Sequence, residues 1–189
     1  MTIFYGGAFN PPTKAHIEIV NLILKTYKNS KVVIVPVGNS YGKNELIDFK
    51  FRYEMLKLVF DNERIIISDL EKDKAFDGTI NSLDELSKTY KDLSFVIGSD
   101  NLLGLDKWIK YEKLLKTYPL IIIKRAEDDV DFLLDKYKNI IKKYDILEFG
   151  KKINSSMIRK DLKNHLEWLD PKIINYIRKY NLYEEWRYV

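Results

Sequence analysis

The feature that most constrains the fold is a regular alternation of short Val- and Ile-rich runs with segments of helical hydrophobic period. The strand-like runs occupy residues 2–5, 31–37, 64–70, 93–97, 119–124 and 146–149. The helix-like segments occupy residues 14–27, 49–60, 79–90, 108–117, 131–136, 155–163 and 171–180. Continuous apolar strands that alternate with helices are typical of parallel strands buried on both faces. The sequence therefore predicts an α/β fold with a doubly wound parallel sheet and a small C-terminal helical part over about 153–189.

The composition excludes several classes of protein. With 46% hydrophobic and 32% charged residues among 189, the chain has enough apolar surface to fold and suits one domain. It has no Cys and only two His, which excludes disulfide frameworks, thiolate-bound zinc, iron–sulfur clusters and His-rich metal sites. We therefore expect no metal-ligating residues. The net charge of +4 is too mild to predict a nucleic-acid partner.

The lengths of the apolar runs and the residues at the N-terminus indicate where in the cell we expect the protein. The sequence has no uninterrupted apolar stretch of about 18 residues, so we expect no membrane-spanning segment. Residues 1–12 have neither the basic n-region nor the apolar h-region of a secretory signal. We expect a cytoplasmic protein that does not bind membranes.

The predicted fold also indicates where a ligand binds. In doubly wound sheets, ligands lie beyond the carboxyl ends of the strands. Three segments should meet there: the loop after residues 2–5, the loop after residues 31–37, and the turn at residues 98–100.

The loop over residues 6–16 joins the first strand to the first helix and combines features that suit an anion-binding site. It matches neither a Walker loop nor G-x-G-x-x-G. Gly6 and Gly7 let the backbone approach a ligand closely, and the following helix start offers unpaired N–H groups suited to phosphate. Thr13 can cap the helix or bind phosphate, and His16 lies one turn further on the same face. A plain Gly-Gly turn with a structural His is the alternative interpretation.

A second polar helix start follows at residues 153–159. The hydroxyls of Ser155 and Ser156 and the forked guanidinium of Arg159 can converge on phosphate oxygens. The alternative is an ordinary N-capped helix with a surface Arg.

These motifs carry a resemblance to a known family. Residues 6–16 resemble the T/H-x-x-H signature of the nucleotidyltransferase superfamily, in the form G-G-x-F-[DN]-P-x-[TH]-x-x-H of nicotinate- and nicotinamide-mononucleotide adenylyltransferases. Thr13 stands where most bacterial members have His. Residues 153–159 resemble I-S-S-T-x-I-R, with Asn154 for Ser and Ser156 for Thr. Residues 35–43 resemble P-V-G-[DN]-x-Y-x-K, and residues 95–100 resemble F-[IV]-[IL]-G-[AS]-D. The resemblance covers nearly all residues and implies one nucleotidyltransferase domain over 1–189.

The resemblance also implies roles for individual residues. The implied catalytic residues are His16, Thr13 and Arg159. Those implied to bind ATP are Gly7, Ala8, Phe9, Thr13, His16, Gly98, Asp100, Ile153, Ser155, Ser156 and Arg159. Those implied to bind the second substrate are Asn10, Lys43, Arg52 and Trp108, with Lys43 on a substrate phosphate and Trp108 stacked on a pyridine ring. For Trp108, simple packing against a helix is the alternative.

The implied reaction is adenylyl transfer from ATP to nicotinate mononucleotide or nicotinamide mononucleotide, with Mg²⁺ bridging triphosphate oxygens. The sequence does not decide between these two acceptors, and the oligomeric state stays open to a homo-oligomer. Nearby phosphates should favour the protonated form of His16. Two alternatives remain: a relative with another acceptor, such as a phosphopantetheine adenylyltransferase or a cytidylyltransferase, and a non-catalytic nucleotide-binding sensor.

Overall fold

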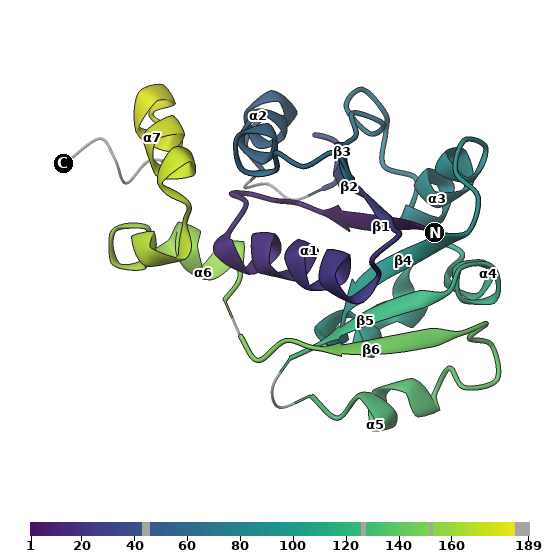
Figure 1. Ribbon diagram of the computed structural model, residues 1–189. Helices are drawn as coiled ribbons and strands as arrows, with labels where there is room; N and C mark the ends of the chain where they lie inside the picture. Colours follow the sequence, from purple (N-terminus) through teal and green to yellow (C-terminus); the bar gives the residue numbers. More distant parts are fainter. Residues whose placement is uncertain (43–45, 126–127, 152, 184–189) are drawn as a thin grey trace.

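A parallel β-sheet forms the centre of the molecule in the computed structural model, which describes residues 1–42, 46–125, 128–151 and 153–183. Within these residues, six strands pair in the order β3-β2-β1-β4-β5-β6 (Figure 1). They are β1 (Thr2–Gly7), β2 (Lys31–Pro36), β3 (Ile65–Ile67), β4 (Leu93–Gly98), β5 (Leu120–Lys124) and β6 (Tyr144–Glu148). Each neighbouring pair is parallel. The predicted α/β fold with a parallel sheet is confirmed.

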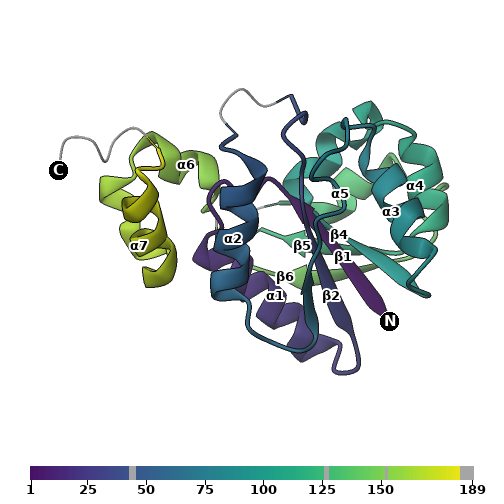
Figure 2. The ribbon, with the colours of Figure 1, turned by 90° about the horizontal axis from the view of Figure 1, so that it is seen from above.

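Helices cover both faces of the sheet, as a doubly wound fold requires. The α-helices are α1 (Lys14–Thr26), α2 (Phe49–Val59), α3 (Thr79–Ser87), α4 (Tyr111–Thr117), α5 (Val130–Asp135), α6 (Ser155–Lys160) and α7 (Pro171–Tyr180). Two 3₁₀ helices, η1 (Ser99–Lys107) and η2 (Lys163–Trp168), complete the set within the described residues. Figure 2 shows α1 and α2 on one side of the sheet and α3 and α4 on the other.

Alternation along the strands explains the two cores. Side chains on a strand point to opposite faces in turn. Phe4 of β1 therefore packs in a cluster with residues of α3, η1, α4 and α5, while Ile3 and Tyr5 pack in a second cluster with residues of α1 and α2. Because both faces of β1, β2, β4 and β5 are buried, these strands consist largely of apolar residues, which is the pattern that the sequence displays. The edge strand β6 is mostly exposed and carries Asp145 and Glu148.

The predicted C-terminal helical part is a separate packed unit beside α2. Its apolar residues form a third cluster with Met55 of α2. The buried members that this unit contributes are Ile158, Leu162, Leu169, Ile173, Ile177 and Leu182. Figure 1 shows this unit at one end of the molecule, next to α2 and the start of α1.

Some element bounds differ from prediction. β3 has three residues rather than the predicted 64–70, because after Ile67 the chain turns, with the Leu70 N–H donating to Ser68 Oγ (3.2 Å). The predicted helix over 108–117 begins only at Tyr111, since Trp108 is extended and Lys110 has a left-handed φ of 52°. The turn predicted at residues 98–100 leads directly into η1, which covers Ser99–Lys107.

Among the described residues, no helix combines the length and the apolar character that crossing a bilayer needs.

Candidate active site

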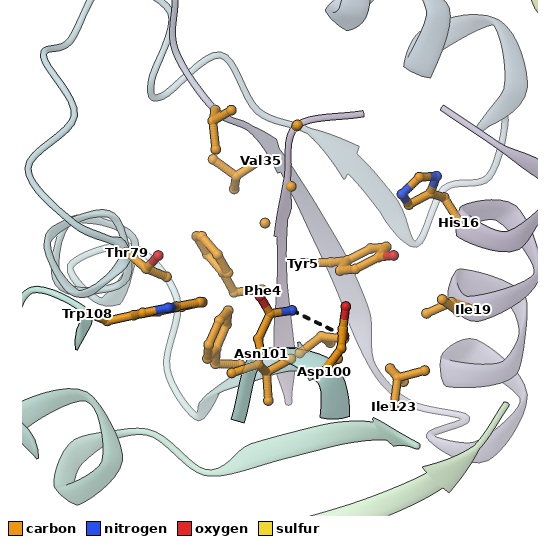
Figure 3. Close-up of a pocket in the computed structure, with 18 of the residues that line it drawn as sticks. Phe4, Tyr5, His16, Ile19, Val35, Thr79, Asp100, Asn101, Trp108 and Ile123 are labelled. Atoms are coloured by element: carbon orange, nitrogen blue, oxygen red, sulfur yellow. Dashed lines mark hydrogen bonds between the residues drawn. The ribbon is translucent and has the colours of Figure 1, made fainter. Parts of the chain in front are cut away.

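The strand order creates a crevice where β1 lies beside β4. The strands after β1 are added toward one edge of the sheet, and those after β4 toward the other edge. The direction of the strand order therefore reverses between β1 and β4, and the crevice lies at their carboxyl ends. A cavity of about 240 Å³ lies there (Figure 3). Its lining comes from the end of β1, from α1, from the loop after β2, and from the residues after β4 and β5. The prediction that three loops meet at this edge is confirmed.

Two glycines form part of the cavity wall. A Cβ added to Gly7 would lie 3.0 Å from the Phe9 ring, which would have to shift by a few tenths of an ångström. A Cβ added to Gly98 would lie 2.4 Å from Asp100 Oδ1, so the Asp100 carboxylate would have to move. Glycine at the ends of β1 and β4 therefore leaves both side chains where they are and lets the backbone approach a ligand.

Thr13 and His16 form a reciprocal cap at the start of α1. The backbone N–H of Thr13 donates to His16 Nδ1 (2.9 Å), and the backbone N–H of His16 donates to Thr13 Oγ1 (3.4 Å). Thr13 is fully buried, and its hydroxyl also lies 2.9 Å from Nδ1. Because Nδ1 accepts from the backbone, the proton of a neutral imidazole resides on Nε2. The ring lines the cavity, so Nε2–H is the donor available to a ligand.

Without a ligand, burial and a neighbouring cation favour the neutral form of His16. Burial, together with the positive charge of Arg125, lowers the pKa of His16 to about 4. The expectation of a protonated imidazole concerns the site with phosphates bound and stays a prediction. The sequence could not reveal the lowered pKa, because it depends on a packed ring and on a cation from a different strand end.

The lowered pKa predicts a dependence of stability on pH. Below the unfolded pKa near 6.5, the unfolded chain binds a proton at His16 that the folded chain does not bind until about pH 4. Stability therefore rises with pH through this window and falls as pH drops, by up to about tenfold in the unfolding equilibrium per pH unit. Urea unfolding of the wild type and of His16→Asn between pH 4 and 7 isolates this contribution. Identical pH dependence in both proteins would contradict it.

Arg125 is a cavity residue that the sequence analysis missed. It follows β5 directly and lines the cavity with His16 and Asp100. Its Nη2 lies 3.8 Å from Asp100 Oδ2, and Asn101 Nδ2 donates to Asp100 Oδ1 (3.3 Å) (Figure 3). The Ser99 hydroxyl accepts the backbone N–H of Arg125 (3.1 Å), which ties the ends of β4 and β5 together. The available signal was its position directly after a predicted strand, at the edge where ligands bind.

The second helix start lies against the loop that leads into α1. Ser155 Oγ donates to the Pro11 carbonyl (2.8 Å), and Arg159 Nη1 donates to the Asn10 carbonyl (2.7 Å). Arg159 Nη2 also donates to Ser156 Oγ (3.3 Å). The starts of α1 and α6, far apart in the sequence, therefore meet at one loop, as the two polar motifs predict. Ile153 packs against the C-terminal apolar cluster.

The residues predicted for the second substrate lie in different surroundings. Trp108 is half-buried, 6.2 Å from the Phe95 ring between centroids, and lines the cavity. It also borders a smaller hollow of about 150 Å³ with Tyr41 and Phe76. Asn10 is buried. Lys43 lies outside the described residues.

Arg52 lies behind the loop and does not line the cavity. It is fully buried and donates from Nε to the Ile47 carbonyl (2.9 Å) and from Nη1 to the Ala8 carbonyl (3.0 Å). Nη2 donates to Asn39 Oδ1 (3.4 Å). In this arrangement the guanidinium holds the backbone at the start of the cavity loop.

These bonds predict a large loss of stability on replacement of Arg52. Arg52→Met removes three hydrogen bonds made by a fully buried guanidinium, which should lower the free energy of unfolding by about 3 kcal/mol or more. Arg64→Met is the matched control. Arg64 is half-buried and also donates to backbone carbonyls, those of Leu24 and Lys28, but water can replace it, so its loss should stay near 1 kcal/mol. Equal losses in urea unfolding would contradict the assignment.

Glu71 is another charged cavity residue that the sequence did not indicate. It is buried, accepts the Ser82 hydroxyl at Oε1 (2.6 Å), and accepts the Gly38 N–H at Oε2 (3.4 Å). It joins the loop after β2 to α3. Its only signal in the sequence is a carboxylate shortly after a predicted strand.

Comparison with known proteins places this site in a family. The cytidylyltransferase-like family model matches residues 4–161. The chain is 41% identical over 187 residues to a probable nicotinate-nucleotide adenylyltransferase of Acholeplasma laidlawii, covering 98% of each chain. It is 34% identical over 192 residues to the protein of the same name from Caldicellulosiruptor bescii, covering 95% of this chain and 97% of that one.

A solved structure agrees with these sequence matches. The Plasmodium falciparum nicotinic acid mononucleotide adenylyltransferase complexed with NaAD superposes with a TM-score of 0.83 at 26% identity, covering 97% of each chain. The same enzyme complexed with APC gives a TM-score of 0.80. Together with the glycine-walled cavity and the converging helix starts, these matches show that the chain belongs to the cytidylyltransferase-like family and, within it, to the nicotinate-nucleotide adenylyltransferases.

Proposed function

We propose that this chain transfers the adenylyl group of ATP to nicotinate mononucleotide and releases pyrophosphate. The observation that carries the proposal is the meeting of two polar helix starts, those of α1 and α6, at one loop beside the β1–β4 switch point. The relatives named nicotinate-nucleotide adenylyltransferase, and the neighbour complexed with NaAD, support nicotinate over nicotinamide mononucleotide as acceptor.

In the proposed reaction, an oxygen of the acceptor phosphate attacks the α-phosphorus of ATP. A bond from that oxygen to the α-phosphorus forms, the bond from the α-phosphorus to the bridging oxygen breaks, and pyrophosphate leaves with the electron pair. A phosphate dianion is nucleophilic near neutral pH, so no protein base is required. Positioning and charge stabilisation then supply the catalysis.

The residues of the two helix starts have distinct parts in this proposal. His16 donates its Nε2–H to a non-bridging oxygen of the α-phosphate, because its Nδ1 accepts the backbone N–H of Thr13. Arg159, with the hydroxyls of Ser155 and Ser156, neutralises the β- and γ-phosphates. Gly98 and Asp100 face the adenosine. Trp108 faces the pyridine ring of the acceptor.

Mg²⁺ enters this proposal as part of the ATP substrate. The described residues contain no gathering of three or more His, Asp or Glu side chains that could hold a metal ion. We propose that triphosphate oxygens and water supply the ligands of the ion. When bound, the ion neutralises charge on the triphosphate.

A panel of acceptors tests the proposal. Pyrophosphate release from ATP is measured with nicotinate mononucleotide, nicotinamide mononucleotide and phosphopantetheine, and the dinucleotide product is identified by chromatography. We expect release with nicotinate mononucleotide at a kcat/KM at least about tenfold above that with the amide, since one buried charge contact is worth that ratio. Release only with phosphopantetheine, or no release with any acceptor, would overturn the proposal in favour of a relative with another acceptor or a nucleotide sensor.

A further inference from the structure

Tyr183, just beyond α7, reaches back to the loop at the other end of the chain. Its hydroxyl donates to Asn10 Oδ1 at 2.9 Å. Burial raises the pKa of the Tyr183 phenol, so it keeps its proton and acts as the donor. Asn10 itself is 1% exposed, so water does not compete for this bond. A residue outside the cavity lining thus restrains a residue of the loop that leads to His16.

Two other donors from the described part of the C-terminal unit also bond to this loop. Arg159 donates to the Asn10 carbonyl (2.7 Å), and Ser155 donates to the neighbouring Pro11 carbonyl (2.8 Å). All three donors belong to the part of the chain after β6. They hold both the side chain and the backbone of Asn10.

The remainder of the loop is held from the other side. The buried Arg52 binds the Ala8 carbonyl, and the reciprocal cap binds Thr13 to His16. The loop over residues 8–13 therefore has a fixed anchor at its beginning, middle and end. Fixed geometry matters here, because a shift of about 1 Å at a reacting group can cost about a hundredfold in rate.

We propose that Tyr183 is a positioning residue for adenylyl transfer: its hydroxyl fixes the Asn10 amide and, through it, the loop that sets the place of His16. This inference rests on the proposed function. Tyr183 acts through Asn10 and touches no reacting atom. The C-terminal unit thereby contributes to turnover by orienting the loop as well as by packing against α2.

Tyr176 provides a matched control in the same unit. It lies on α7, and its hydroxyl donates to Glu54 of α2, away from the loop. Tyr183→Phe and Tyr176→Phe each remove one hydroxyl and one hydrogen bond between the C-terminal unit and the rest of the protein. If Tyr183 served only to dock the unit, the two variants would behave alike.

The test compares both variants with the wild type in steady-state kinetics, thermal unfolding and hydrogen exchange of a peptide covering residues 6–16. We expect Tyr183→Phe to lower kcat about tenfold with little change in the KM for ATP, and to speed exchange in that peptide. Tyr176→Phe should stay within about twofold of wild type in kcat, with unchanged exchange. Equal kcat losses in both variants, or an unchanged kcat in Tyr183→Phe, would overturn the inference. A wild type without turnover would refute the proposed function instead, and the exchange data would still decide whether Tyr183 restrains the loop.

Discussion

His16→Ala is expected to lower kcat for dinucleotide formation by about 100- to 1,000-fold, the usual cost of one preorganised donor to a developing charge. The KM for ATP should change by less than about threefold, since the donor serves the transition state more than the ground state. The structural basis is the tautomer of the His16 ring. The backbone N–H of Thr13 donates to Nδ1, which leaves Nε2–H as the donor at the cavity.

The chain offers a matched control for this substitution. His165 is the other histidine, and its Nδ1 lies 2.7 Å from the Asp161 carbonyl in the C-terminal unit. His165→Ala should leave kcat within about twofold of wild type. Initial rates at saturating acceptor, with ATP varied, separate kcat from KM. A loss in His16→Ala that came wholly from a raised KM would contradict a role in the transition state.

Arg159→Ala is expected to raise the KM for ATP by about ten- to a hundredfold and to lower kcat as well. The first effect follows from loss of a charged donor to the triphosphate, which is worth about 1.5–3 kcal/mol. The second follows from loss of the bond from Nη1 to the Asn10 carbonyl, which holds the loop. Arg159→Lys should recover part of the KM and little of the kcat, because a lysine keeps the charge without the fork.

Lys160 is the neighbouring cation on α6 and is exposed. Lys160→Ala removes the same charge from the same helix and should change the KM for ATP by less than about twofold. If Lys160→Ala raised this KM as much as Arg159→Ala, the effect would come from the general field of the helix and not from a contact with phosphate.

Much of the fold could be predicted because its signal is local. Each strand buried on both faces is a continuous apolar run, and each covering helix shows its own period, so element types and their order follow from the sequence. The polar motifs also follow, because Gly6-Gly7 and residues 153–159 stand directly at element boundaries. The confirmed convergence of the starts of α1 and α6 rests on these local signals together with the motif resemblance.

The strand order could not be derived in the same way. An apolar run in the sequence does not show which strand it will pair with. The pairing of β5 with β4 is visible only in the folded sheet. Arg125 was missed for that reason, since it reaches the cavity through this pairing. The lowered pKa of His16 in the ligand-free site was missed as well, because Arg125 and burial together cause it.

The sequence also did not indicate which polar residues are buried. Arg52 stands on a helix whose spacing indicates one apolar face toward the sheet, yet its side chain is fully buried and bonds to Ala8, Asn39 and Ile47. These tertiary contacts, which the sequence does not display, account for its burial. The link from Tyr183 to Asn10 has the same origin, since it joins residues that the sequence separates by nearly the whole chain.

The central claim is that the starts of α1 and α6 hold one triphosphate between them. A crystal structure with a non-hydrolysable ATP analogue and nicotinate mononucleotide tests it most directly. The account predicts His16 Nε2 within about 2.7–3.1 Å of an α-phosphate oxygen, and the Arg159 guanidinium in contact with the β- or γ-phosphate of the same molecule. A triphosphate that contacts only one of these side chains, or that lies outside the cavity between β1 and β4, would contradict it.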